Sequence, residues 1–327
     1  MTDLVAEAPA PLAALLEPTW REERRRALVI VNPYATTVSD RLRDLVLHAL
    51  ASRYEVEAAD TEARGHATEI CREAVQGDYD VVIAFGGDGT VNEAANGLAG
   101  SDVPLTALPG GTTNVYCKLL GIPGEIIAAT ERLLRTADHW HPRRVGLGRV
   151  NDRYFTFTAG LGIDAGVVRH VDRHPSRKAR FGGNYFVCAA LWTYLGQLRR
   201  TSHLTATVHG RTLAGITAII QNGEHYTYLG DRPIDAAEGG RLDDGTLAGI
   251  VLERANLLDV PSLLVRGLSR HAALASHRHI ESFAEATELV VESADGRPLP
   301  LHVDGDYVAD VQQASFEVHP GALTVVA

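Results

Sequence analysis

The sequence predicts an α/β domain with a doubly wound parallel sheet, followed by a β-rich domain of antiparallel, sandwich-like architecture. Three observations support this prediction. A chain of 327 residues suggests two domains. In the first part, short apolar runs typical of buried strands alternate strictly with segments of helical periodicity. From about Arg144 onward, short β-rich runs separated by turns dominate instead.

The first domain is expected over residues 24–143, after an Ala- and Pro-rich segment, residues 1–23, that we expect to be a loose tail. A helix near Glu125–Arg135 ends its alternation. Its expected strands are Ala27–Val31, Tyr54–Ala58, Val81–Phe85 and Leu105–Leu108.

The second domain is expected over residues 144–314. Two helices, near Gly183–Leu198 and Leu258–Leu268, interrupt its strands. The chain end, residues 315–327, offers a further strand at Ala322–Val326 that can fold back onto the first domain. The expected strands are Val145–Val150, Tyr154–Thr158, His203–His209, Ile216–Gln221, Gly249–Leu252, Leu289–Glu292 and Leu299–Val303.

Composition excludes several classes of protein. The formal net charge of −10 argues against nucleic acid as the main partner, because binding a phosphate backbone needs a broad basic surface. Three scattered cysteines without a CxxC pair suit a reducing compartment better than disulfides or a zinc site, and no carboxylate or cysteine cluster completes a zinc site with the fourteen histidines. No basic signal region and no apolar run of membrane-spanning length occur, so the prediction is a cytoplasmic protein. Contact with a membrane surface stays open.

A glycine-rich loop, Gly86–Thr90 (GGDGT), follows the strand at Val81–Phe85 and opens a helical pattern. Its three glycines permit positive φ angles and let backbone N–H groups approach an anion closely. Thr90 is expected to cap the helix, whose N-terminus favours negative charge. Asp88 supplies a proton acceptor or a magnesium anchor. The spacing fits neither the Walker pattern nor the dinucleotide fingerprint, so the prediction is a phosphate site of another kind, the alternative being a tight strand-to-helix turn.

A second loop, Pro109–Asn114 (PGGTTN), follows the next strand of the alternation. Ligands of doubly wound sheets bind at the carboxyl ends of the strands, where both loops, Asn32 and Thr61 are expected to meet. The sequence therefore predicts a nucleotide site at this edge. Asp304 and Asp306, which flank a glycine, are expected to aim carboxylates into the same cleft, the alternative being a hairpin turn with solvated acids.

The two loops together resemble the diacylglycerol kinase catalytic family, which also holds sphingosine and ceramide kinases and the bacterial lipid kinases. NAD kinases and some phosphofructokinases share GGDGT, but further similar segments follow in order and cover the chain from about Ala27. They are Thr61 with Gly65–Ala67, Ala159–Ala165 (AGLGIDA), Leu242–Leu247 (LDDGTL) and His302–Asp306 (HVDGD).

The resemblance implies ATP-dependent phosphorylation of a lipid hydroxyl in a cleft between the two domains. It implies that Asp306 is the proton acceptor, helped by Asp304, and that Asp88 organises metal and phosphate. It also implies Mg²⁺ and a structural metal held by Asp244 with the carbonyls of Arg241 and Thr246. The residues implied to bind ATP are Asn32, Thr61, Gly86, Gly87, Asp88, Gly89, Thr90, Asn92, Gly111 and Thr112.

Three departures from the family pattern matter. Asp306 is one methylene shorter than the expected Glu, Val115 replaces the usual Asp after Asn114, and Tyr34-Ala35 replaces a Ser-Gly pair. The sequence thus predicts an ATP- and Mg²⁺-dependent lipid kinase acting on diacylglycerol or a similar lipid. A kinase of a soluble substrate and a non-catalytic lipid-binding protein remain as alternatives.

The segment Arg169–Arg180 (RHVDRHPSRKAR) is basic, and an apolar helix rich in aromatic residues is expected after it. A peripheral enzyme could use such a surface to reach anionic lipid at the inner face of the membrane, and the alternatives are a solvated loop and a core helix. A homodimer stays open, since nothing in the sequence sets the oligomeric state.

Overall fold

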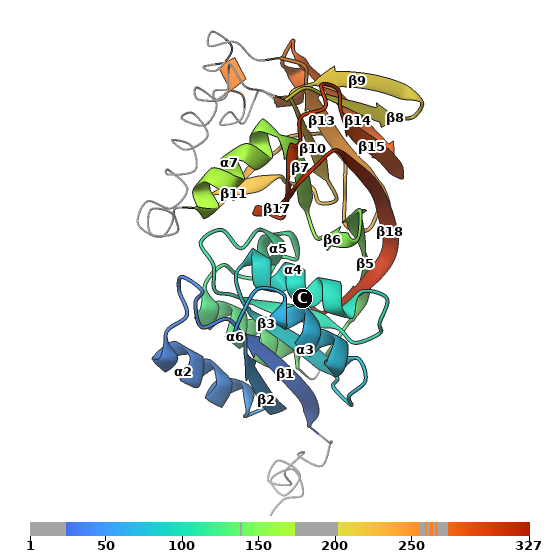
Figure 1. Ribbon diagram of the computed structural model, residues 1–327. Coiled ribbons are helices and arrows are strands. Elements are labelled where there is room, and N and C mark those ends of the chain that lie inside the picture. Colours follow the sequence, from blue (N-terminus) through green and yellow to red (C-terminus); the bar gives the residue numbers. More distant parts are fainter. Residues whose placement is uncertain are drawn as a thin grey trace, which may run out of the picture.

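The computed structural model describes residues 24–137, 139–173, 202–254, 259, 262–263, 266 and 274–327. An α/β half runs from β1 to α6 and a β half from β5 to β18, with the second stacked above the first in Figure 1. The predicted fold class is confirmed. The expected tail, the helix at residues 183–198 and Cys188 lie outside the described residues, as does most of the helix expected near residues 258–268.

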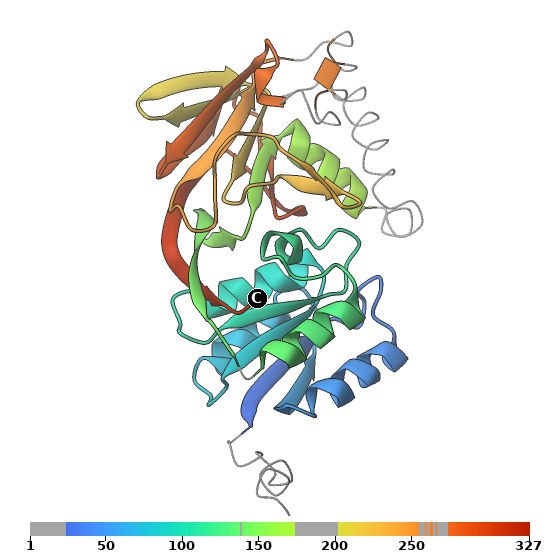
Figure 2. The same ribbon diagram turned by 180° about the vertical axis from the view of Figure 1, so that it is seen from behind.

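The α/β half is built on four parallel strands in the order β2-β1-β3-β4. Every residue of the central strand β3 is buried, because helices cover both faces of the sheet. Helices α3 and α4 pack together on one face, and α2 and α6 on the other (Figures 1 and 2). The strands are β1 (Arg25–Val31), β2 (Tyr54–Asp60), β3 (Val81–Gly86) and β4 (Leu105–Pro109), and the helices are α2 (Asp40–Leu50), α3 (His66–Ala74), α4 (Asp88–Leu98), α5 (Val115–Leu119) and α6 (Ile126–Thr136).

The β half contains a six-stranded antiparallel sheet in the order β14-β13-β10-β7-β16-β17. Its apolar face packs against the strands β15, β8 and β18 of the larger sheet, in a core that includes Leu161, Val251, Val291 and Phe316. This is a sandwich of two sheets. The strands of the six-stranded sheet are β7 (Thr158–Gly162), β10 (Thr217–Gln221), β13 (Leu247–Leu252), β14 (Ile280–Ala286), β16 (Leu299–Val303) and β17 (Asp306–Val311).

The larger sheet continues from the α/β half into the sandwich through β18 (Gln313–Val325), a 13-residue strand. β18 pairs antiparallel with β15 and β5, and its end lies parallel to β4, where Val325 is opposite Leu105. Figure 1 shows β18 curving along one side of the molecule from the upper to the lower half. The remaining strands are β5 (Arg143–Val150), β6 (Arg153–Phe155), β8 (Leu204–Val208), β9 (Arg211–Gly215) and β15 (Glu288–Ser293).

Some elements differ from the sequence prediction. Residues 163–172 form a helix, α7 (Ile163–Asp172), where only a glycine-rich strand end was expected. The strands β9, β14 and β17 were not predicted. β9 and β14 bury only two residues each, and no residue of β17 is fully buried, so none of them has the continuous buried apolar run that marked the predicted strands. A short hairpin, β11 (Thr227–Leu229) with β12 (Arg232–Ile234), and a 3₁₀ turn, η1 (Leu274–Ser276), complete the described elements.

Candidate active site

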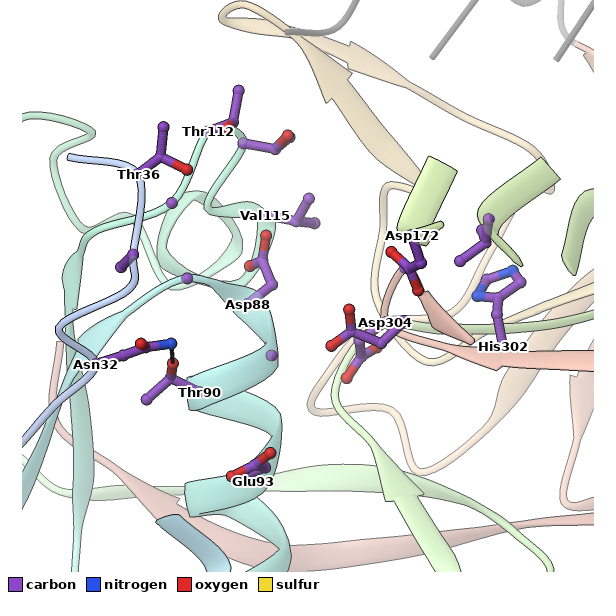
Figure 3. Close-up of a pocket in the computed structure, with 18 of the residues that line it drawn as sticks. Asn32, Thr36, Asp88, Thr90, Glu93, Thr112, Val115, Asp172, His302 and Asp304 are labelled. Atoms are coloured by element: carbon purple, nitrogen blue, oxygen red, sulfur yellow. Dashed lines mark hydrogen bonds between the residues drawn. The ribbon is translucent and has the colours of Figure 1, made fainter. Parts of the chain in front are cut away.

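A cavity of about 630 Å³ lies between the two halves and is lined by residues from both. Figure 3 shows its two walls. Asn32, Asp88 and Thr112 stand on the α/β side, and Asp172, His302 and Asp304 on the β side. The predicted nucleotide edge of the sheet therefore faces the acids predicted in the second half.

The two glycine loops meet backbone to backbone on the α/β side. The N–H of Gly110 donates to the carbonyl of Gly86 at 2.7 Å. A Cβ atom on Gly111 would lie only 2.8 Å from the Cα of Gly87, and one on Gly110 2.9 Å from the Cα of Gly86. Only glycine permits this approach, and it leaves backbone N–H groups of both loops at one place.

Thr90 does not cap the helix as predicted. Helix α4 begins at Asp88 with Gly87 as its N-cap, so Thr90 lies within the first turn. The Thr90 hydroxyl instead accepts a hydrogen bond from the side-chain amide of Asn32 at 3.1 Å (Figure 3). This bond joins the loop after β1 to the glycine loop, so Asn32 holds the edge together.

Asp88 joins the glycine loop to helix α5. Its Oδ1 accepts the backbone N–H of Tyr116 at 3.0 Å, within the first turn of that helix. Burial raises the pKa of Asp88 from 3.8 to about 6 against the opposing effect of hydrogen bonds from the N–H groups of Tyr116 and Val115, and the negative charges of Asp304 and Asp306 contribute to the increase. The carboxyl group thus titrates close to neutral pH.

Asp306 reaches across the cavity to the glycine loop. It is the first residue of β17, and its Oδ2 lies only 2.6 Å from the position that a Cβ atom on Gly89 would occupy. The carboxylate therefore rests on the bare Cα of Gly89, at the start of α4. Sequence analysis assigned these two residues to separate motifs and expected a common cleft, and the structure brings them into contact distance.

Asp304, which was predicted to help in catalysis, is buried and hydrogen-bonded within the protein. Only 5% of the residue is exposed, its φ is 49°, and both carboxylate oxygens accept hydrogen bonds. The donors are the Asn92 side chain at 2.8 Å, the Thr156 N–H and hydroxyl at 2.7 and 2.8 Å, and the N–H groups of Phe157 and Thr158 at 3.0 Å. Asp304 holds the strand start at Thr158 and the helix α4 together.

The predicted ATP-binding residues divide into two groups. Thr61, Gly87, Gly89, Gly111 and Thr112 line the cavity, as do Asn32, Asp88 and Thr90. Gly86 ends β3 and Asn92 is buried, and neither is part of the cavity wall. The ATP contact of Asn92 stays a prediction, and in this structure its amide donates to Asp304 and to the carbonyl of Tyr154.

Several residues of the wall carried no assigned role in the sequence. Glu93 accepts the N–H groups of Gly65 and Ala67 and thereby fixes the turn before α3. His302 pairs with Asp164 at 2.6 Å in the β half. His302 belongs to a segment noted for its resemblance and Glu93 does not, and no spacing rule shows that either residue faces the cavity. Further wall residues are Arg64, Phe157, Val168, Asp172, Tyr226, Tyr228, Leu229 and Ile234.

The turn proposed for a structural metal offers few free oxygens. The Asp244 carboxylate has the Arg241 side chain 3.8 Å away, and the Arg241 carbonyl accepts the Asp244 N–H at 3.1 Å. Both side chains are about half exposed, and the metal site assigned to one carboxylate and two carbonyls at this turn stays a prediction. Within the described ranges, no group of three or more His, Cys, Asp or Glu side chains is arranged to hold a metal ion. Thr246 follows in the same segment, and no step below depends on a metal at this turn.

The basic segment is described only up to Arg173. Arg169 lies in α7, where its guanidinium pairs with both oxygens of Asp310 at 3.0 and 3.1 Å and lies 5.7 Å from the Tyr307 ring. Arg169 is thus committed to an ion pair within the chain. The remainder of the segment lies outside the described residues, and no helix among the described residues is long and apolar enough to cross a membrane.

Comparisons with known proteins show what the chain is similar to. Residues 26–149 match the family described as the diacylglycerol kinase catalytic domain. A diacylglycerol kinase of Staphylococcus aureus (strain bovine RF122 / ET3-1) is 28% identical over 288 residues, which cover 87% of each chain. One of Staphylococcus haemolyticus (strain JCSC1435) is 27% identical over 292 residues, covering 87% of this chain and 83% of that one.

Solved structures agree on the fold. The crystal structure of a diacylglycerol kinase from Bacillus anthracis str. Sterne superposes with a TM-score of 0.69 at 25% identity, covering 92% of this chain and 96% of that one. Another structure from the same organism gives a TM-score of 0.71 at 24% identity, covering 92% and 97%. The comparisons confirm the predicted resemblance to the diacylglycerol kinase catalytic family and the prediction of an enzyme of the lipid kinase class.

Proposed function

We propose that this chain, a kinase by its likeness to that family, transfers the γ-phosphate of ATP to the hydroxyl of diacylglycerol or a similar lipid. The product is phosphatidic acid or an analogous phospholipid. One observation carries the proposal: the Asp306 carboxylate of the β half lies against Gly89 of the glycine loop, within a single cavity. A phosphate donor on the loops and a proton acceptor for an alcohol are thereby brought together.

The α/β wall suits the phosphates of a nucleotide. Helix α4 begins at the cavity wall, next to the place where the two loops meet at Gly87 and Gly111. The N–H groups of Gly110 and Gly111 are bonded within the protein, to Gly86 and Asn114, so the anion is expected at the N-terminus of α4. Phosphoryl transfer depends mainly on such positioning and on neutralising the charge of the phosphoryl oxygens. Asn32 and Thr112 complete this wall.

Mg²⁺ is part of this proposal. Magnesium in kinases is commonly held by one or two carboxylates together with the substrate phosphates, so no cage made only of protein groups is required. Asp88 fits that role, because one of its oxygens is bound to the Tyr116 N–H and the carboxylate lines the cavity. When bound, the ion neutralises negative charge on the phosphates.

We propose that Asp306 is the general base, which takes the proton of the acceptor hydroxyl, and that Asp304 positions it. A general base must come within hydrogen-bond reach of the hydroxyl, and Asp306 stands beside the glycine loop where the γ-phosphate is expected. Asp304 has both oxygens occupied by donors and fixes the turn from which Asp306 projects. Asp88, with its pKa near 6, is the alternative proton acceptor.

The acceptor side of the cavity suits a lipid. The β half contributes apolar and aromatic wall residues, namely Phe157, Val168, Tyr226, Tyr228, Leu229 and Ile234. Such a surface accommodates the first part of an acyl chain, while the acids hold the polar end. Because Arg169 is paired with Asp310, contact with an anionic membrane surface is proposed for the basic residues after Arg173 and the segment that follows.

A transfer assay with labelled ATP and Mg²⁺ tests the function. Purified full-length protein is offered diacylglycerol, monoacylglycerol, ceramide and sphingosine in mixed micelles, with NAD and a sugar phosphate as soluble acceptors. We expect label in a chloroform-soluble product and its loss in Asp88→Asn. Asp44→Asn, on the exposed face of α2, is the matched control. No transfer to any lipid, or an Asp88→Asn variant as active as the wild type, would overturn the proposal.

A further inference from the structure

We infer that His302 forms a polar subsite for the head group of the acceptor lipid, next to the group that takes its proton. The inference rests on the proposed function and adds a residue that positions the substrate. The ligand chemistry is an ester carbonyl of a neutral glycerolipid.

His302 is held in one orientation by a chain of hydrogen bonds. The residue is 1% exposed, and its Nε2 lies 2.6 Å from Oδ2 of Asp164. The other oxygen of Asp164 accepts the Tyr226 hydroxyl at 2.7 Å. Both carboxylate oxygens of Asp164 therefore have partners, and the imidazole ring is fixed from behind, an arrangement common for histidines that present their second nitrogen to a ligand.

The second ring nitrogen of His302 has no partner. Nδ1 is buried and makes no hydrogen bond to any described residue, although His302 belongs to the cavity wall. Buried polar atoms are nearly always paired, so each exception requires an explanation. Here the cavity supplies one, because a substrate group bound in it can provide the missing partner. Figure 3 shows the His302 ring on the β side of the cavity, near Asp172.

The fold makes specific room for this pair. A Cβ atom on Gly160 of β7 would lie 2.5 Å from both the Asp164 Oδ2 and the His302 Nε2. Any other residue at position 160 would separate the imidazole from its carboxylate. The glycine in the segment AGLGIDA thus has a steric reason connected to His302, beyond the turn at Gly162.

His302 also lies close to Asp306. In the β16–β17 pairing Val303 is opposite Asp306, so His302 stands one residue further along the neighbouring strand. One strand spacing and one residue rise place the two Cα atoms roughly 6 Å apart. This register directs the two side chains to opposite faces of the strand pair, because successive side chains alternate in direction, but both residues belong to the wall of the one cavity. A glycerolipid whose hydroxyl meets Asp306 extends along that wall to place an ester group at His302.

The chemistry of the lipid decides which group the ring can meet. Diacylglycerol has one hydroxyl, the group proposed to lose its proton to Asp306, and its remaining polar groups are esters, which only accept hydrogen bonds. Nδ1 therefore meets an ester carbonyl as an N–H donor, while Nε2 stays paired with Asp164.

Two substitutions separate a direct contact from a structural role. His302→Gln can keep an amide near the Nε2 position, facing Asp164, and removes the polar atom at Nδ1. His302→Asn places an amide near Nδ1 and gives up the bond to Asp164. The matched control is His203→Gln, since His203 pairs with Asp295 at 3.5 Å in the same half and is not part of the cavity wall.

KM values for diacylglycerol and for ATP are measured in mixed micelles, together with Tm. We expect His302→Gln to raise the lipid KM about tenfold, the effect of losing one well-placed hydrogen bond. His302→Asn should stay within about threefold of the wild type, with the ATP KM unchanged in both. Lipid KM values within twofold for both variants, a larger loss for Asn than for Gln, or an equal rise in the ATP KM would overturn the inference.

Two further arms keep the outcomes separate. Binding of a fluorescent diacylglycerol in the same micelles is measured without ATP. Weaker binding by His302→Gln but not by His302→Asn supports the subsite, even if the transfer assay detects no lipid phosphorylation. The absence of phosphorylation would refute the proposed function instead. Equal binding by the wild type and both variants would overturn the subsite. Comparing diacylglycerol with its diether analogue tests the bonded group. A wild-type preference for the ester that His302→Gln abolishes supports the ester carbonyl, and the absence of such a preference in the wild type overturns the subsite.

Discussion

The side-chain amide of Asn92 donates a 2.8 Å hydrogen bond to the carboxylate of Asp304, joining helix α4 of the α/β half to the turn between β16 and β17. The same carboxylate takes four further donors from residues 156–158 of the β half. This contact fixes the distance between the glycine loop and the β16–β17 turn, on which the proposed chemistry depends.

Asp304→Asn should destabilise the protein strongly. The new amide faces N–H donors where the carboxylate accepted them, which costs about 3 kcal/mol and lowers Tm by roughly 5 °C or more. Differential scanning calorimetry checks this, with Asp44→Asn as the exposed control. An unchanged Tm for Asp304→Asn would contradict the buried clamp, and a loss of kcat without loss of stability would favour a catalytic role for Asp304.

Gly111→Ala should weaken ATP use while leaving the fold intact. Its methyl group would lie 2.8 Å from the Cα of Gly87 and force the two loops apart. A displacement of about 1 Å can lower kcat/KM by up to roughly 100-fold. Gly124→Ala is the matched control, because a Cβ at Gly124 meets no atom within 4 Å. Steady-state kinetics with varied ATP that gave the same values for both variants would refute the role of the loop contact.

Substitutions at Asp306 should separate charge from length. Asp306→Glu keeps the carboxylate and should retain part of the activity, whereas Asp306→Asn should lose about 10²- to 10⁴-fold in kcat. Gly89→Ala should also reduce kcat, since its methyl group would meet the carboxylate at 2.6 Å. Equal activity of the Asn and Glu variants in the transfer assay would move the proton acceptor elsewhere, to Asp88 in the first instance.

The activity should have an acidic limb set by Asp88. Its pKa of about 6 means that the carboxylate proposed to hold Mg²⁺ becomes protonated below that pH. The plot of kcat/KM for ATP against pH should therefore fall as the pH drops through about 6. A limb that ends below about pH 5 would contradict this assignment.

The contribution of Asp88 to stability should fall as the pH rises, whereas the activity should rise. Because the folded-state pKa of Asp88 is raised from 3.8 to about 6, the native state binds more protons than the unfolded state between these values. The contribution of Asp88 to the free energy of unfolding therefore decreases as the pH rises through this window. In Asp88→Asn that contribution is absent, so the Tm of the variant should rise relative to the wild type between pH 4 and about 6 and stay level above. A constant difference would exclude the raised pKa.

The parallel sheet could be predicted from the sequence, because its strands are buried on both faces and form continuous apolar runs such as Val81–Phe85. It missed α7, because apolar residues such as Val167 and Val168 extend a run that also suits a strand. It missed β14, in which only Phe283 and Ala286 are buried.

For the site, local motifs identified the loops and the acids but not how they meet. The contact between Asp306 and Gly89, and the burial of Asp304 against Asn92, join positions that lie far apart in the chain. Such distances follow from strand order, in particular from the β16–β17 hairpin, which the turn signal alone left undistinguished from a solvated turn. No sequence pattern shows that both carboxylate oxygens of Asp304 accept hydrogen bonds from within the protein.

The position of β18 has a consequence for synthesis on the ribosome. Its last residues pair with β4, and Gly100 donates to the carbonyl of Ala322 at 2.7 Å, although β18 is the last described element to be translated. Until it emerges, the growing chain carries β4 as an open strand edge beside an otherwise complete parallel sheet, and open edges are prone to pair with other chains. The α/β half therefore reaches its final sheet only after the described part of the chain has been made.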